Sequence, residues 1–147
     1  MKKVPNQVRL VVLLIAVLMI GYGCSKKEKS SEETGSLKSE LIKNIQNINQ
    51  FDSIVQSSGR KLLVFDLYAD WCGPCKVLEP ILKDVAEMQS QKANFYKVDI
   101  DKHTHIAREF RVKGIPYVVL VKEGQVIHSI TGVQPKVVYL EAVEKFQ

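Results

Sequence analysis

The chain has 147 residues, of which 46% are apolar, and this is enough for one domain with a packed core. Its formal charge is +5, but three of its 21 basic residues lie within the first ten positions, and every acid follows residue 23. Without residues 1–23, 18 basic residues face 16 acids, and no basic run is interleaved with aromatics, which argues against nucleic-acid binding.

Residues 1–23 have the layout of a secretory signal. Lys2, Lys3 and Arg9 supply positive charge, and an unbroken apolar segment follows over residues 10–20 before small residues appear. A helix that spans the hydrocarbon core of a membrane needs about 20 apolar residues, so this segment is shorter than a typical membrane-spanning helix. The N-terminus therefore predicts export from the cytoplasm.

Cys24 comes directly after this segment, and the arrangement resembles the bacterial lipoprotein signal, in which such a cysteine is lipidated. The resemblance implies a lipid anchor on Cys24 in a bacterial membrane, with the rest of the chain on the extracytoplasmic, periplasmic side. Gly21 stands where that family favours a leucine-like residue and Tyr22 is bulky for its position. An uncleaved anchor and an ordinary cleaved signal are therefore alternatives. The polar composition that follows predicts a tether over 24–36 and a folded domain over 37–147.

From residue 41 onward, short apolar runs typical of strands alternate with segments of helical periodicity. The run over 61–69 is almost continuously apolar, which indicates a strand buried on both faces. Glu123 and Gly124 predict a hairpin turn, while Asn49 and Asp101 are candidate helix caps. This pattern predicts an α/β fold with a central mixed sheet flanked by helices on both faces. The predicted elements are a short strand within 41–48, a helix over 50–59, a strand over 61–69, a helix over 75–91, a strand over 93–100, a helix over 103–110, a hairpin over 117–131 and a helix over 136–146.

Cys72 and Cys75 flank Gly73 and Pro74 between the buried strand and the long helix. A sulfur at Cys72 would face free backbone N–H groups and the positive end of the helix dipole, both of which stabilise the reactive thiolate. Cys75 lies three residues on, on the same helix face and within disulfide reach. We predict thiol–disulfide exchange, with Cys72 as the exposed nucleophile and Cys75 as the resolving thiol.

A zinc site and a purely structural disulfide are the alternatives for this cysteine pair. Zinc usually takes four ligands, but the sequence has no second cysteine pair, and the spacing of His103 and His105 on a polar helix predicts surface residues. A disulfide that closes so short a loop adds little stability. We expect no metal, and no cofactor other than the Cys72–Cys75 disulfide.

Asp66 is a lone acid within the buried strand, where a carboxylate is costly unless it is used or paired. Burial would raise its pKa, which suits a proton carrier that serves Cys75 through water. The alternative is an Asp66 side chain that points to solvent at a sheet edge. Lys97 could approach Asp66 from a neighbouring strand and modulate it, or it could be an ordinary exposed lysine.

Together these residues resemble the thioredoxin family, from about Ile45 to the C-terminus. "WCGPCK", residues 71–76, is the active-site motif of that family. The resemblance implies a thioredoxin fold and thiol–disulfide oxidoreductase activity on client proteins that contain disulfides. The other matching positions, in chain order, are the buried acid Asp66, the helix-kinking Pro80, the lysine Lys97 near the acid, the cis-proline Pro116 and the groove glycine Gly132.

The resemblance also implies a substrate groove beside the disulfide. Tyr117 departs from the family, which usually carries threonine after the cis-proline, so partner choice could differ. The groove residues are Trp71, Gly73, Pro74, Ile115, Pro116, Tyr117 and Gly132.

The direction of electron flow is predicted to be reducing, because Gly73-Pro74 and Ile115 resemble the reducing members of the family. Outside the cytoplasm neither thioredoxin reductase nor NADPH is present, so we expect a membrane thiol-transfer protein as electron donor. Clients could be apocytochrome c or envelope enzymes with oxidised thiols. A disulfide-forming oxidase or isomerase is the alternative that an oxidising compartment favours, and a redox-silent binding module is a further one. We expect a monomer.

Overall fold

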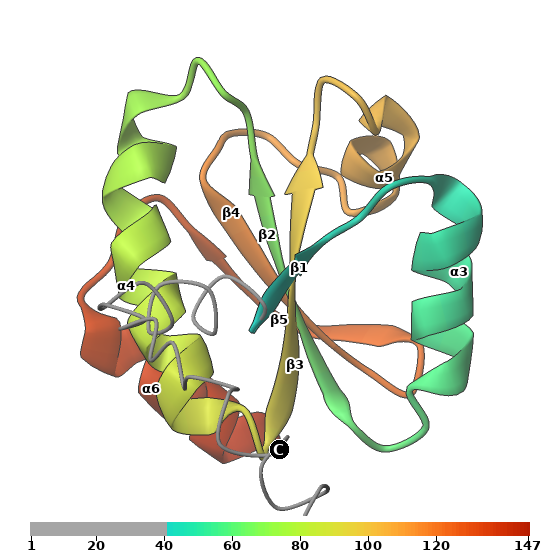
Figure 1. Cartoon of the computed structure of the whole chain (residues 1–147), viewed down its shortest axis with the longest axis vertical. Helices are drawn as coiled ribbons and strands as arrows, with labels where there is room; N and C mark the ends of the chain where they lie inside the picture. The colour runs from blue at the N-terminus through green and yellow to red at the C-terminus, as the bar shows by residue number, and fades with distance from the viewer. Residues whose placement is uncertain (1–40) are drawn as a thin grey trace, which may run out of the picture. The chain divides into compact units, whose positions relative to one another are not determined.

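A computed structural model describes residues 41–147 (Figure 1). The predicted signal over 1–23, the tether over 24–36 with Cys24, and the first residues of the predicted domain lie outside the described residues. Within 41–147, no helix combines the length and the apolar character that crossing a membrane requires.

Five strands form one mixed sheet in the spatial order β1-β3-β2-β4-β5. The three strands β1 (Ile42–Asn44), β2 (Leu62–Tyr68) and β3 (Ala93–Asp99) are parallel. The hairpin of β4 (Tyr117–Lys122) and β5 (Gln125–Thr131) adds two antiparallel strands beside β2. The sheet is therefore mixed, as predicted, with β2 at its centre.

Two layers of helices cover the sheet, as the sequence pattern predicted. The helices α4 (Gly73–Gln89) and α6 (Lys136–Phe146) lie on one face, and α3 (Ile48–Ser57) and α5 (Thr104–Glu109) lie on the other (Figure 1). Each layer packs its apolar side chains against the sheet in a separate core. A central mixed sheet with helices on both faces is the architecture that the resemblance implied.

Strand β2 contributes to both cores because its side chains alternate between the two faces of the sheet. Leu62 and Val64 pack on the α4 side, whereas Leu63, Phe65 and Leu67 pack on the α3 side. All five side chains are buried, which explains the continuous apolar run in the sequence.

Phe65 is the centre of an aromatic cluster on the α3 side. Its ring centroid lies 5.2 Å from that of Phe51, 5.3 Å from that of Tyr96 and 5.8 Å from that of Phe110. Phe51 and Phe110 also meet edge to face, at 5.7 Å. The cluster joins α3, β2, β3 and the residue after α5 into one packed unit.

The hairpin turn forms where it was predicted. Glu123 and Gly124 have φ angles of 52° and 75°, and two successive positive φ angles match the twist of a tight hairpin. Glycine adopts this conformation without strain, which accounts for Gly124 at the second position.

Both predicted helix caps are wrong. Asn47 rather than Asn49 caps α3, since its Oδ1 accepts a hydrogen bond from the backbone N–H of Gln50 at 2.9 Å. The cap of α5 is His103, and Asp101 instead donates its backbone N–H to Oδ1 of Asp99 at 3.0 Å. Asn47 and Asn49 have the same capping preference, so residue type alone could not choose between them, and His103 at the start of α5 makes no side-chain cap hydrogen bond.

The prediction that His103 lies on the surface is also wrong. The residue is buried, and its Nε2 lies 3.0 Å from the carbonyl oxygen of Ile45, which follows β1. This contact brings the residue after β1 against the beginning of α5. His105 is exposed, as predicted.

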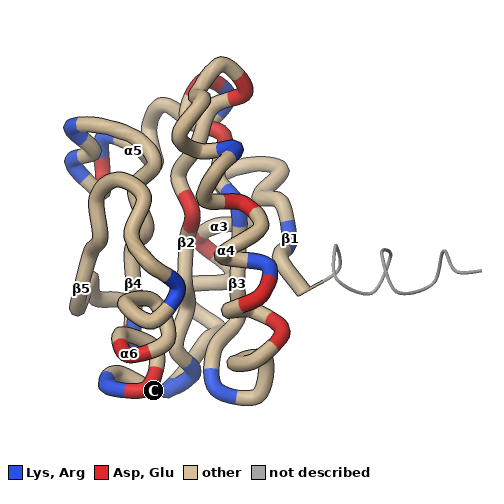
Figure 2. Tube along the Cα trace, turned by 90° about the vertical axis from the view of Figure 1, so that its left-hand side faces the viewer, with Lys and Arg blue, Asp and Glu red and all other residues tan. Residues whose placement is uncertain are grey.

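Basic and acidic residues are interspersed along the described part of the chain (Figure 2). Nucleic-acid-binding domains instead gather lysine and arginine on one face or along one helix. The charge distribution thus gives no support to a nucleic-acid surface.

Replacing Phe65 with Ala is expected to lower the free energy of unfolding by about 3–5 kcal/mol, because the cavity cannot close in so well packed a cluster. Urea denaturation followed by circular dichroism measures the change. Met88→Ala is the control, because this exposed side chain on α4 is expected to contribute within about 0.5 kcal/mol. Equal effects of the two substitutions would contradict the placement of Phe65.

Candidate active site

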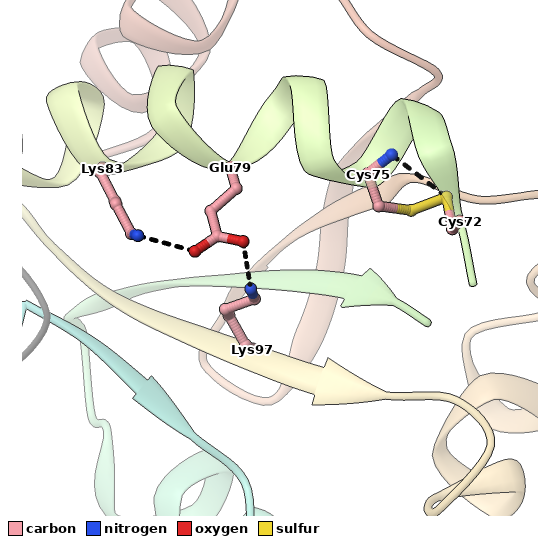
Figure 3. A network of polar contacts seen from close by, with 5 residues as sticks. All are labelled: Cys72, Cys75, Glu79, Lys83 and Lys97. Atoms are coloured by element: carbon pink, nitrogen blue, oxygen red, sulfur yellow. Dashed lines mark hydrogen bonds and ion pairs between the residues drawn. A yellow bond between two sulfur atoms is a disulfide. The ribbon is translucent and has the colours of Figure 1, made fainter. Parts of the chain in front are cut away.

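Cys72 and Cys75 form a disulfide at the beginning of α4 (Figure 3). Their Cα atoms are 5.3 Å apart, and Cys72 is the N-cap of the helix with an extended backbone. Its Sγ accepts a hydrogen bond from the backbone N–H of Cys75 at 3.1 Å. The predicted N–H environment of the sulfur is therefore present. The same contact would stabilise a thiolate at Cys72 after reduction.

The prediction that Cys72 is the exposed cysteine is wrong for this oxidised state. Cys72 is 3% exposed and Cys75 is 5% exposed. The disulfide turns the Cys72 sulfur toward the first turn of α4, where both cysteines pack with Ala69 and the partly buried Ile115. Proximity in the chain could not reveal this cover, because Ile115 comes from a distant loop.

The residues next to the buried disulfide in the chain are exposed, namely Trp71, Gly73 and Pro74. Trp71 is 69% exposed, and its Nε1 donates a hydrogen bond to Oδ2 of Asp101 at 2.8 Å. Pro74 lies in the first turn of α4, where a missing N–H costs nothing. These three residues are exposed to solvent, whereas both cysteines are almost fully buried.

The loop before β4 lies against the disulfide, as the resemblance implied. The Ile115–Pro116 bond is cis, and Pro116 is buried. The backbone N–H of Gly132 donates to the carbonyl oxygen of Pro116 at 2.8 Å, and Gly132 has a φ of 77°. Tyr117 follows at the start of β4 and is half-buried. Two of the three segments that carry predicted groove residues, the loop before β4 and the residue after β5, are thus joined by a backbone hydrogen bond.

Asp66 is buried in β2, so the alternative of a solvent-facing side chain at a sheet edge is wrong. Burial raises the pKa of its carboxyl from 3.8 to about 7; the positive charge of Lys97 opposes this shift and the negative charge of Glu79 adds to it. Its Oδ1 has no hydrogen-bond partner among the described residues. A group with this pKa can take up and release protons near neutral pH, as the predicted carrier must. The carrier role itself stays a prediction.

Lys97 lies on β3 directly opposite Asp66 in the parallel register of β2 and β3. Its side chain is only 16% exposed, so it is not an ordinary surface lysine. Its Nζ is 3.3 Å from Oε2 of Glu79 and 4.2 Å from the ring centroid of Tyr68. No ion pair between Lys97 and Asp66 occurs in the described part. The predicted approach of the lysine to the acid is thus electrostatic rather than a direct contact.

Glu79 and Asp101 are site residues that the sequence analysis missed. Glu79 lies four residues after Cys75 on α4, which is the spacing of neighbours on one helix face. That spacing was available in the sequence and could have placed Glu79 beneath the helix with Cys75. Nothing in the sequence connects Asp101 with Trp71, because their contact joins residues that are 30 positions apart.

No group of three or more potential metal ligands occurs among residues 41–147. His103 uses its Nε2 on a backbone carbonyl, and the two cysteines are bonded to each other. Within the described region, the chemistry at this site is that of the disulfide.

Replacing Asp66 with Asn is expected to stabilise the folded protein at about pH 8, and to change its stability little at about pH 3.5. The folded-state pKa of Asp66, about 7, exceeds the ordinary 3.8. Between these two values the Asp66 carboxyl is ionised in the unfolded chain but stays protonated in the folded protein. The free energy of unfolding of the natural protein therefore falls as the pH rises from about 4 to 7, and then levels off.

The Asn variant lacks this ionisation, so its expected gain above pH 7 is about 4 kcal/mol, measured by urea denaturation at both pH values. A gain of the same size at both pH values would contradict the electrostatic cause and point to packing.

Comparison with known proteins agrees with this geometry. The thioredoxin family model matches residues 36–145. The chain is 37% identical over 93 residues to the thioredoxin of Malassezia sympodialis, which covers 62% of this chain and 89% of that protein. It is 36% identical over 97 residues to the thioredoxin of Staphylococcus saprophyticus, with 66% and 90% covered.

Solved structures agree as well. The crystal structure of the Malassezia sympodialis thioredoxin has a TM-score of 0.66 at 32% identity, covering 71% of this chain and 90% of that one. Thioredoxin NaTrxh from Nicotiana alata has a TM-score of 0.69 at 28% identity, covering 73% and 93%. With the Cys72–Cys75 disulfide at the matching position, the chain belongs to the thioredoxin family and is a protein thiol–disulfide oxidoreductase that acts on disulfide-containing clients.

Proposed function

We propose that this protein reduces disulfides of client proteins outside the cytoplasm while a lipid on Cys24 tethers it to a bacterial membrane. The observation that carries the proposal is the Cys72–Cys75 pair at the beginning of α4, beside the cis-proline Pro116, in a chain whose first 23 residues read as an export signal. The Gly73-Pro74 pair between the cysteines and Ile115 before the cis-proline support the reducing direction, through their resemblance to reducing thioredoxins.

The first step is an attack of the reduced Cys72 on a client disulfide. The Cys72 thiolate forms a bond to one client sulfur, the client S–S bond breaks, and the other client sulfur leaves as a thiolate that takes a proton from solvent. The backbone N–H of Cys75 and the beginning of α4 favour the thiolate form of Cys72. The product is a mixed disulfide between Cys72 and the client.

The second step releases the client. Cys75 gives its proton, through water, to the carboxylate of Asp66, and the resulting thiolate attacks the sulfur of Cys72. The mixed disulfide breaks, the Cys72–Cys75 disulfide forms, and the client sulfur leaves and is protonated. Two electrons and two protons have passed to the client, and Asp66 returns its proton to solvent. A carboxyl with a pKa of about 7 suits this exchange near neutral pH.

The oxidised protein then needs two electrons before it can act again. We propose that a dithiol of a membrane thiol-transfer protein supplies them, by the same exchange chemistry in reverse. Clients would be proteins whose thiols become oxidised in the envelope, such as apocytochrome c before haem attachment or thiol-dependent enzymes. Tyr117, half-buried next to Pro116, replaces the usual threonine and is a candidate for client selection.

The reduction potential of the Cys72–Cys75 pair is expected near the value of thioredoxins, about −270 mV. Equilibration with glutathione or a reference thioredoxin measures it. Cys72→Ser is the control, because it lacks the disulfide and is expected to lose insulin-reducing activity completely.

A potential above about −180 mV would overturn the reducing direction and favour an oxidase or isomerase, since disulfide isomerase lies near −180 mV and the strong periplasmic oxidant near −120 mV. Full activity of Cys72→Ser would remove the catalytic role of the pair and leave a redox-silent binding module.

Cells that express the full chain with a radiolabelled fatty acid are expected to yield a labelled, membrane-bound protein, because the lipid would be attached at Cys24. Cys24→Ala should lose the label, whereas Cys75→Ser should keep it as the matched cysteine control. Labelling that survives Cys24→Ala would contradict the lipid anchor, and a protein recovered without label would indicate a cleaved or uncleaved ordinary signal.

A further inference from the structure

We infer that Glu79 is a positioning residue: by pairing with Lys97 it holds that ammonium group on the helix side and away from the carboxyl of Asp66. The inference rests on the proposed function for the use of Asp66 as proton acceptor. It goes beyond that function, because it assigns to Glu79 the control of the pH at which Asp66 accepts a proton.

Glu79 is a bridge between two lysines (Figure 3). Its Oε1 lies 2.7 Å from Nζ of Lys83 on the next turn of α4, and its Oε2 lies 3.3 Å from Nζ of Lys97 on β3. Each carboxylate oxygen therefore has its own cation. The bridge comes one helical turn after Cys75, so it lies on the helix face that turns toward the sheet.

Lys97 is the side chain whose placement matters. Opposite residues in adjacent parallel strands share a face of the sheet, and Lys97 and Asp66 are such partners. A lysine stem could carry its ammonium either to the buried carboxyl or to the helix above. The ammonium pairs with Glu79 and lies over the ring of Tyr68, while Oδ1 of Asp66 has no partner in the described part.

Several elements place side chains near Asp66, and two of these side chains, Lys97 and Glu79, are charged. Lys97 on β3 favours the ionised carboxyl, and Glu79 on α4 opposes it. Tyr68 on β2 and Tyr139 on α6 interact with Asp66, and the pKa of each is raised, chiefly by burial, so both are neutral near pH 7. The partner of Asp66 on β4 is the apolar Val118.

Glu79 itself is ionised throughout the range in which Asp66 titrates. The hydrogen bond from Lys83 and, after it, the charge of Lys97 lower the pKa of Glu79 below its ordinary value. The bridge thus acts on Asp66 in two ways with the same sign. It holds the ammonium group of Lys97, which favours ionised Asp66, away from that carboxyl, and it adds the negative charge of Glu79, which disfavours ionised Asp66. Both effects keep Asp66 protonated to higher pH.

The test is a direct titration of the Asp66 carboxyl by ¹³C NMR in the oxidised protein, where turnover has no part. In the natural protein the midpoint is expected at about 7. Glu79→Gln should lower it by about one pH unit or more, because Lys97 is then free to approach Asp66. Glu87→Gln, the same substitution about two turns further along α4, should leave the midpoint unchanged.

A double-mutant cycle separates positioning from simple charge. In a Lys97→Met background, Glu79→Gln should lower the midpoint by less than half as much as it does when Lys97 is present. An undiminished shift in that background would mean that Glu79 acts by its own charge alone, and would overturn the inference. So would an unchanged midpoint in the single variant Glu79→Gln.

Failure of the proposed function gives a different result. The pH profile of insulin reduction by Glu79→Gln should move to lower pH together with the Asp66 midpoint. If the midpoint moves and the profile does not, Asp66 is not the proton acceptor for Cys75, while the placement of Lys97 by Glu79 stands.

Discussion

The central position of β2, paired on both edges, is the constraint on which the active site depends. Its backbone is bonded to β3 on one side and to β4 on the other, so its path cannot shift without breaking the sheet. The strand ends at Tyr68, and a short loop leads to Cys72 at the beginning of α4. Strand β4 runs the opposite way, so Pro116, just before its start, reaches the same end of the sheet. One strand therefore brings Cys72 and the cis-proline Pro116 to the same place.

The same strand carries a cost. A carboxyl in the middle of a buried strand is disfavoured whenever it ionises, and no hydrogen bond to Oδ1 of Asp66 offsets this within the described chain. Proteins keep such unfavourable groups at functional sites and compensate elsewhere. Here the compensation is the aromatic and aliphatic packing on both faces of β2, in which five of its seven side chains are buried apolar groups. The surrounding charges then adjust the carboxyl rather than neutralise it.

The chemistry is divided between buried and exposed residues around α4. The two sulfur atoms lie in an apolar cluster with Ala69 and Ile115, whereas Trp71 and the first turn of the helix are open to solvent. Low polarity around the disulfide makes the few polar groups near it effective, because charges interact more strongly where water is excluded. The polar groups concerned are the backbone N–H of Cys75, which donates to the Cys72 sulfur, and the half-buried bridge of Lys97, Glu79 and Lys83, which acts on Asp66.

The order of strands and helices, the burial of β2 and the hairpin turn at Glu123-Gly124 were all predictable from the sequence, because periodicity, apolar runs and turn preferences are local properties. Asp66 and the cysteine pair were predictable because a lone acid in an apolar run and a CGPC segment are local too. The cap of α3, the burial of His103, the cover over Cys72 and the partner of Lys97 were not. The cap of α3 is a local choice between Asn47 and Asn49, which have the same capping preference, so residue type alone could not decide it. The other three features depend on residues far apart in the chain that meet only when the sheet assembles, and a long lysine side chain has several partners within reach until packing selects one.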